Sequence, residues 1–216
     1  MKQIPNPNII DILKSNKLDI FATFNCHRIG IINSFDPTSQ TASVQLVDKR
    51  TVNIIKDNGV QYYNYSVLVN CPVYIPKAAA GGYTYPISAG DNCLVLFNDR
   101  DIDNWFNDGL VQVPNSVRMH DLSDGIVIVG LYNLNNAIAD YNNSATEMNY
   151  GLTKISLTDK IVIQNATQNL KTVLDSLITC LLNLQILDPI SGNLSITTAT
   201  VTALDNVQNN LNSLLK

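Results

Sequence analysis

The chain has 216 residues and a net charge of −4, with 45% hydrophobic and 15% charged residues. It is long enough for one domain with its own core and an appendage. No basic stripe runs along it, so we expect no nucleic-acid partner. Its longest apolar run, Leu177–Leu184, is shorter than the roughly 20 residues that span a bilayer, so we expect no stable membrane insertion.

Residues 1–25 are expected to form an N-terminal helix and a lead-in. Ile9, Ile12 and Leu13 would share one face of a helix over Asn8–Leu18, and Asn8 can cap it. No apolar signal segment with a cleavage site precedes this helix, so no secretory signal is expected.

Residues 26–132 are predicted to form a series of short strands. The expected strands are Arg28–Ile32, Thr41–Val47, Thr51–Ile55, Tyr65–Ile75, Asn92–Phe97 and Gly125–Leu131. Asp36-Pro37-Thr38 predicts a turn, and Pro72 a bulge or an edge strand. Asn92–Phe97 is nearly all apolar and is predicted to be the most buried strand. This number of short strands predicts a small antiparallel barrel or sandwich, with long loops at 77–90 and 98–125.

Residues 133–152 are interpreted as a linker, and residues 153–165 alternate again. Ile155, Leu157, Ile161 and Ile163 would lie on one face of a hairpin. One hairpin cannot bury such a face alone, so this segment needs a partner.

Residues 166–216 predict a helical hairpin. The first helix, Thr167–Gln185, is capped by Thr167 or by Gln164-Asn165, and the second spans Thr198–Leu215. Asp188–Gly192 reverses the chain. Each helix has a narrow apolar seam: Leu170, Leu174, Leu177, Leu181 and Leu184 in the first, and Val201, Leu204, Val207, Leu211 and Leu214 in the second. Three copies around an axis would bury both seams; the alternative is a two-helix flap packed on the barrel.

Catalytic and metal-binding patterns are not found. Cys26, Cys71, Cys93 and Cys180 fit no zinc spacing and are interpreted as small buried residues. His27 and His120 belong to no known catalytic motif. The acidic stretch Asp99–Asn104 has the beginning of a calcium loop, but Trp105 and Phe106 follow where glycine and then glutamate are needed. Pairing of aspartates with arginine is the preferred interpretation of this loop, and we expect no catalytic, cofactor or metal site.

Four stretches resemble the N-terminal OB-fold domain of central-spike proteins from contractile phage tails, the baseplate-assembly or spike family. They are Asn33–Leu46, Val69–Val73, Pro86–Trp105 and Arg118–Ile126. The resemblance implies a homotrimer with OB barrels at the tube-facing end and a β-helix or prism pointing away. The family's His-x-His apex has no counterpart here, since no histidine follows His120.

Together these observations predict a mainly β chain with a C-terminal helical hairpin. An OB-fold barrel (26–132) is followed by the linker, a short trimeric β-prism (153–165) and helices that form a trimeric bundle (166–216). The predicted trimer interface comprises Ile155, Leu157, Ile161, Ile163, Leu170, Leu174, Leu177, Leu181, Leu184, Val201, Leu204 and Leu211.

The expected function is that of a non-enzymatic central spike or hub at the baseplate of a contractile phage tail or tail-derived particle. It would help to penetrate the host envelope or carry a separate spike-tip protein, with baseplate hub or tail-tube proteins as partners. It would be made in the bacterial cytoplasm and reside in the virion. One alternative is an OB-fold module for nucleic acid or saccharide, using Tyr62, Tyr63, Tyr65, Tyr83 and Tyr85. The other is a baseplate-associated hydrolase.

Overall fold

The structure is a computed structural model that describes residues 8–54, 59–183, 185–188, 190, 192–195 and 197–214. The chain divides into two compact units, Met1–Ala137 and Ile138–Lys216. No helix within the described residues is long and apolar enough to cross a membrane.

The first unit begins with helix α1 (Ile9–Thr23). The Asn8 side chain accepts a hydrogen bond from the Ile10 amide at 3.3 Å, which confirms the predicted cap. The helix continues past the predicted end at Leu18 and closes where the Phe24 amide donates to the Ile20 carbonyl. Most apolar side chains of α1, including Ile9, Leu13 and Ile20, are exposed.

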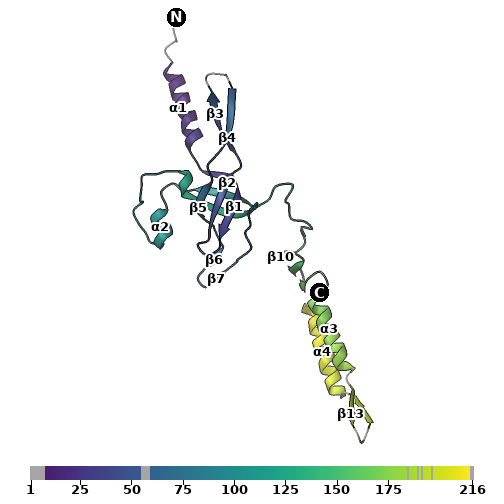
Figure 1. The fold of residues 1–216 in the computed structure, drawn as a ribbon. Helices are drawn as coiled ribbons and strands as arrows, with labels where there is room; N and C mark the ends of the chain where they lie inside the picture. The colour runs from purple at the N-terminus through teal and green to yellow at the C-terminus, as the bar shows by residue number, and fades with distance from the viewer. Residues whose placement is uncertain are drawn as a thin grey trace. The chain divides into compact units, whose positions relative to one another are not determined.

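A curled five-stranded antiparallel sheet forms a half-barrel in the middle of this unit (Figure 1). Its order is β5-β2-β1-β8-β9, from β1 (His27–Asp36), β2 (Thr41–Leu46), β5 (Leu68–Pro72), β8 (Asn92–Phe97) and β9 (Gly125–Leu131). The two edges approach each other just after β5, where Val73 bridges Val127 and the Tyr74 amide donates to the Val127 carbonyl at 2.7 Å. The barrel expected from the sequence is therefore present as this half-barrel.

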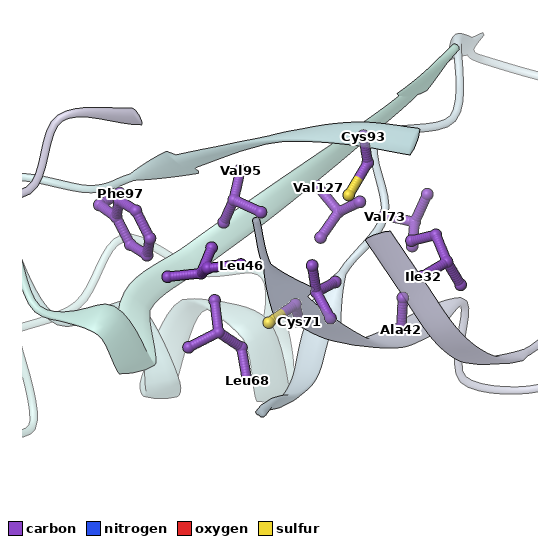
Figure 2. Packing of buried hydrophobic residues seen from close by; sticks show 11 residues of the cluster. Ile32, Ala42, Leu46, Leu68, Cys71, Val73, Cys93, Val95, Phe97 and Val127 are labelled. Carbon is purple, nitrogen blue, oxygen red and sulfur yellow. The ribbon is translucent and has the colours of Figure 1, made fainter. Parts of the chain in front are cut away.

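The core lies inside the curl, and Figure 2 shows side chains from all five strands meeting there. Val44, Cys93, Val95 and Val127 have no exposed surface. The strands come so close that a Cβ atom on Gly30 would lie 2.3 Å from Val44 Cγ1, so only glycine fits at this position.

The strand lengths and burial of this sheet differ in part from those predicted. Pro72 does end an edge strand, but the predicted long strand Tyr65–Ile75 is shorter. Within β5, Asn70 takes a left-handed conformation (φ 55°) and the register with β2 shifts. The prediction that Asn92–Phe97 is the most buried strand is wrong. Alternate residues of β8 point outward, leaving Leu96 exposed, whereas β2 has more buried positions.

Shorter elements decorate the half-barrel. They are the hairpin of β3 (Lys49–Ile54) and β4 (Gly59–Asn64), the hairpin of β6 (Lys77–Ala78) and β7 (Gly81–Gly82), helix α2 (Asp103–Asp108) and the 3-10 helix η1 (Leu122–Asp124). β4 was not predicted, and Ile55 of the predicted strand Thr51–Ile55 lies outside the described residues.

The second unit contains a three-stranded antiparallel sheet followed by two helices. The sheet has the order β10-β11-β12, formed by β10 (Thr146–Tyr150), β11 (Thr153–Leu157) and β12 (Ile161–Gln164). β10 lies in the segment interpreted as a linker. Helices α3 (Leu170–Leu182) and α4 (Thr198–Leu214) contact each other, and a hairpin of β13 (Gln185–Asp188) and β14 (Gly192–Ser195) connects them (Figure 1).

The start of α3 differs from the prediction. Neither Thr167 nor Asn165 caps it; Asn169 does, accepting from the Lys171 amide at 2.8 Å. Asn165 instead holds the preceding turn, where it accepts from the amides of Thr167 and Gln168. The reversal predicted at Asp188–Gly192 falls at the tip of the β13–β14 hairpin.

Candidate functional site

The C-terminal sheet has one apolar face. In the strand register Met148 pairs with Ile155, and Ile155 with Ile163, so these side chains project from the same side of the sheet. Leu157 and Ile161 form the next pair on that side. Met148 is 60% exposed and Leu157 49%. A small sheet that leaves its apolar face in water needs another surface to cover it.

The opposite face of the same sheet is polar and internally satisfied. The Glu147 carboxylate accepts hydrogen bonds from the Ser156 hydroxyl and, at 3.3 Å each, from Lys154 Nζ and Asn142 Nδ2. The Ser156 hydrogen bond is the main cause that lowers the pKa of Glu147, followed by burial in the opposite sense and then the other two donors. Because this face needs no further partner, the apolar face is the one available for assembly.

The helix pair likewise has one covered side and one exposed apolar side. α3 buries Ile178 against its surroundings, and Leu174 is half-buried. Asp175 joins the two helices, since it accepts a hydrogen bond from Gln208 of α4. Within α3 it also pairs with Lys171 at 2.5 Å. These two contacts lower the pKa of Asp175, Lys171 having the larger effect.

A second stripe on α3 remains exposed. It consists of Leu170, Val173, Leu177 and Leu181, which are spaced three or four residues apart. Leu177 is 54% exposed. One helix thus has a seam for α4 and another seam without a partner in the described chain.

The structure places the predicted interface residues in three groups. Ile155, Leu157, Ile161 and Ile163 share one sheet face, as the alternation indicates. Leu170, Leu177 and Leu181 form part of the exposed stripe, whereas Leu174, Val201, Leu204 and Leu211 are half-buried. Leu184 lies outside the described side chains. Whether these residues meet in a trimer remains a prediction.

Sequence reasoning missed several members of these surfaces. Met148 and Tyr150 continue the apolar face, and their signal is the alternation of Thr146–Tyr150, which the surrounding asparagines obscure. Ile178 and Val173 were missed because the heptad pattern predicts one apolar stripe, whereas α3 has two.

In the N-terminal unit, the loop after β8 is held by a cluster around Arg118. Arg118 Nη2 lies 3.0 Å from Asp124 Oδ1, 2.9 Å from Asp103 Oδ2 and 3.3 Å from Asp101 Oδ1. Asp101 also accepts from the Ser116 hydroxyl at 2.6 Å. The side chains of Asp101 and Asp124 are completely buried.

The electrostatics of this cluster fit an ion-pair role. The Asp124 and Asp103 hydrogen bonds raise the pKa of Arg118, and the Ser116 hydroxyl, then the Asp103 amide, lower that of Asp101. The three carboxylates lie close enough to share a cation, but the guanidinium already bonds all of them. Pairing of aspartates with arginine was predicted; Arg118, rather than Arg100, provides the cation.

The main contact of His120 is the packing of its ring against Phe24. Its ring lies 3.8 Å from the Phe24 ring between centroids, and its carbonyl accepts from Asn25 Nδ2 at 2.9 Å. Its Nε2 is 3.6 Å from Asp99 Oδ1. These contacts hold the segment after α1 to the loop. His27 begins β1 at the sheet's outer surface and is exposed.

The cysteines divide into two pairs. Cys71 and Cys93 are buried, and burial raises the pKa of each thiol to about 11. Cys26 and Cys180 are exposed, so their interpretation as buried residues is wrong. All four are free thiols.

Residues 29–130 match the family described as phage protein Gp138 N-terminal domain. This part of the chain is therefore similar to the phage protein Gp138 N-terminal domain. The matched segment runs from β1 to β9, so the family domain coincides with the half-barrel. No curated protein matches the chain.

This match confirms the predicted resemblance to a phage baseplate or spike protein family. The match supports a phage structural protein that is a component of the virion. The apolar sheet face and the two helices lie outside the matched residues, so their role has to be argued from their own geometry.

Proposed function

We propose that this protein is the central spike or hub at the baseplate of a contractile phage tail or tail-derived particle, and that it acts as a homotrimer. The observation that carries the proposal is the exposed apolar face of the β10–β12 sheet, which follows a Gp138 N-terminal domain in the same chain. A structural protein with such a face has a surface suited to self-assembly.

Copies of the chain are a suitable cover for this face. The face has no charged side chain, so a second identical face offers it no unpaired charge. β10–β12 sheets packed with these faces inward would form a β-prism. The number three comes from the resemblance to trimeric central-spike proteins.

The exposed stripe of α3 supports the same assembly. Burying a large apolar side chain stabilises an interface by roughly 1.5–3 kcal/mol. Around the same axis, three α3–α4 pairs would place Leu170, Val173, Leu177 and Leu181 in the interior of a six-helix bundle.

The role in the particle is mechanical. In this proposal the Gp138 N-terminal domains contact the baseplate hub or the tail tube, and the prism and bundle extend along the axis. The chain either helps to penetrate the envelope or carries a separate spike-tip protein at the end of the bundle. No chemical step by this chain is needed for either role.

Labelling of particles tests the proposal. Antibodies against the chain, viewed by electron microscopy on purified particles with contracted sheaths, should mark the end of the tail tube. Particles from a deletion strain provide the control and should lack both the label and the central density. Label on the capsid, or absence of the protein from purified particles, would contradict the proposal.

A further inference from the structure

We infer that the N-terminal domain makes its own contact between copies, in which the loop 109–117 of one copy inserts into a cleft beside the β3–β4 hairpin of its neighbour. The inference rests on the proposed function in that it requires neighbouring copies. It concerns a surface separate from the prism and the bundle.

The loop presents apolar side chains outward. Val111 is fully exposed, Val117 is 93% exposed and Val113 81%, although all three are large apolar residues. Isolated exposed residues are ordinary, but several on one short loop are typical of an interaction site.

The loop is also held in shape. Its end is fixed by Ser116, which bonds Asp101 of the Arg118 cluster, and its middle by Asn104, whose Nδ2 donates to the Val113 carbonyl at 3.0 Å. An ordered loop loses little conformational entropy when it binds, which favours association. The Arg118 cluster thus has a functional consequence, because it orders a loop that has no core to pack against.

The cleft lies between the β3–β4 hairpin, the segment before β5 and η1. Its volume is about 540 Å³, and its lining includes Arg50, Tyr63, Val67, Val69 and Leu122. Val69 and Tyr63 are both more than half exposed. The cleft is in the size range of pockets that hold a small organic ligand, so two or three aliphatic side chains fit in it.

The two surfaces have complementary charges. Asp108 stands at the base of the loop, where its carboxylate accepts from Gln112 but pairs with no cation among the described residues. Arg50 lies in the cleft wall, and the described carboxylates leave it without an ion pair. Insertion of the loop would bring Asp108 toward Arg50. Complementary charges of this kind fix the orientation of a partner more than they add affinity.

We take a neighbouring copy as the occupant because the exposed valines and Asp108 of the loop match the apolar lining and Arg50 of the cleft. Within one copy, no residue of the loop 109–117 lines the cleft, and Val111 is fully exposed. The loop of a copy therefore does not fill the cleft of that same copy. Two different surfaces on one copy form a heterologous contact, and such contacts close into a ring when the rotation between copies is a simple fraction of a turn.

Photo-crosslinking in the full-length chain tests the inference. A benzophenone amino acid replaces Val113 in a mixture of chains with natural and heavy nitrogen isotopes. Crosslinked peptides should join position 113 of one chain to residues 61–69 of another and carry both isotopes. The same probe at Tyr83, an exposed residue outside the loop and the cleft, is the matched control and should give at least tenfold less of this product.

Exchanging the charges at positions 50 and 108 provides a second test. Arg50→Glu and Asp108→Lys should each lower the crosslink yield about tenfold, and the double variant should restore most of it. Absence of mixed-isotope products from position 113 in a protein that light scattering shows to be a trimer would overturn this inference and leave the proposed function standing. A monomer would overturn both.

Discussion

The two units of this chain use the same sequence pattern with opposite results. Both contain strands in which apolar residues alternate with polar ones, but the half-barrel buries its apolar side chains and the β10–β12 sheet leaves them exposed. Of the twelve buried hydrophobic residues among those described, eleven belong to the half-barrel and only Ile178 to the second unit.

The difference follows from the number of strands and their curl. Five strands bring their edges together at Val73 and Val127 and enclose one face within a single chain. Three short strands cannot curl far enough to do so, and their apolar face has to be covered by something else. Period-two alternation therefore identifies a buried face, but it does not show whether one chain or several chains bury it.

The largest effect is expected from charge on the exposed sheet face. Leu157→Asp with Ile161→Asp would place unpaired carboxylates inside the proposed prism, at a cost of several kcal/mol per site. We expect monomers by light scattering, while the half-barrel keeps its own melting transition. Asn149→Asp, an exposed position on the polar face, introduces the same charge and should leave the assembly intact. If the double variant assembled like the natural chain, the face would not be an interface.

Removal of the helices should have the next largest effect. A chain ending at Asn165 loses the α3 stripe, whose large apolar side chains each contribute roughly 1.5–3 kcal/mol when buried. The trimer should then dissociate at higher protein concentration, as analytical ultracentrifugation over a dilution series would show. Dissociation at the same concentration as for the full chain would mean that the bundle adds nothing to the assembly.

Arg118→Met should affect the other unit alone. The change leaves the buried carboxylates of Asp101 and Asp124 without their cation, so it destabilises the half-barrel. Each kcal/mol lost lowers the melting temperature by about 4–8 °C for a domain of this size, and a decrease of that order or more is expected in calorimetry. Arg100→Met is the matched control, because Arg100 forms no ion pair within the described residues, and it should have little effect. Equal effects of the two changes would show that the cluster is not important for stability.

The smallest effect is expected on the melting temperature at acidic pH. Hydrogen bonds lower the pKa of Glu147 below its ordinary value of 4.5, so the folded protein holds fewer protons here than the unfolded chain. The stabilisation is complete above that value and is lost as the pH falls through the lower folded pKa. Glu147→Gln should therefore reduce the pH dependence of the second unit's melting temperature below about pH 5. Asp159→Asn, in the turn after β11, is the control. An unchanged acid response in Glu147→Gln would contradict the assigned contact.

The half-barrel was largely predictable because its signals are local. Pro37 marks a turn, the run around Val44 alternates, the run around Val95 is apolar, and the family motifs fall on the same strands. The residues that form the Arg118 cluster could not be predicted individually. Asp101 and Arg118 are far apart in sequence, and only the fold decides which arginine reaches the aspartates.

The second unit was predicted less completely, for a related reason. The face of Ile155, Leu157, Ile161 and Ile163 follows from alternation alone. β10 is interrupted by asparagines and was missed. The two stripes of α3 also cannot be separated from sequence, because the position of α4 decides which of them is covered.

Light scattering of the purified full-length chain measures whether three copies assemble. We expect a single species with three times the 23.8 kDa mass of the chain, stable to dilution into the low micromolar range. A species of 23.8 kDa at the concentrations used for the other experiments would contradict it, because the sheet face and the α3 stripe would then be exposed in solution.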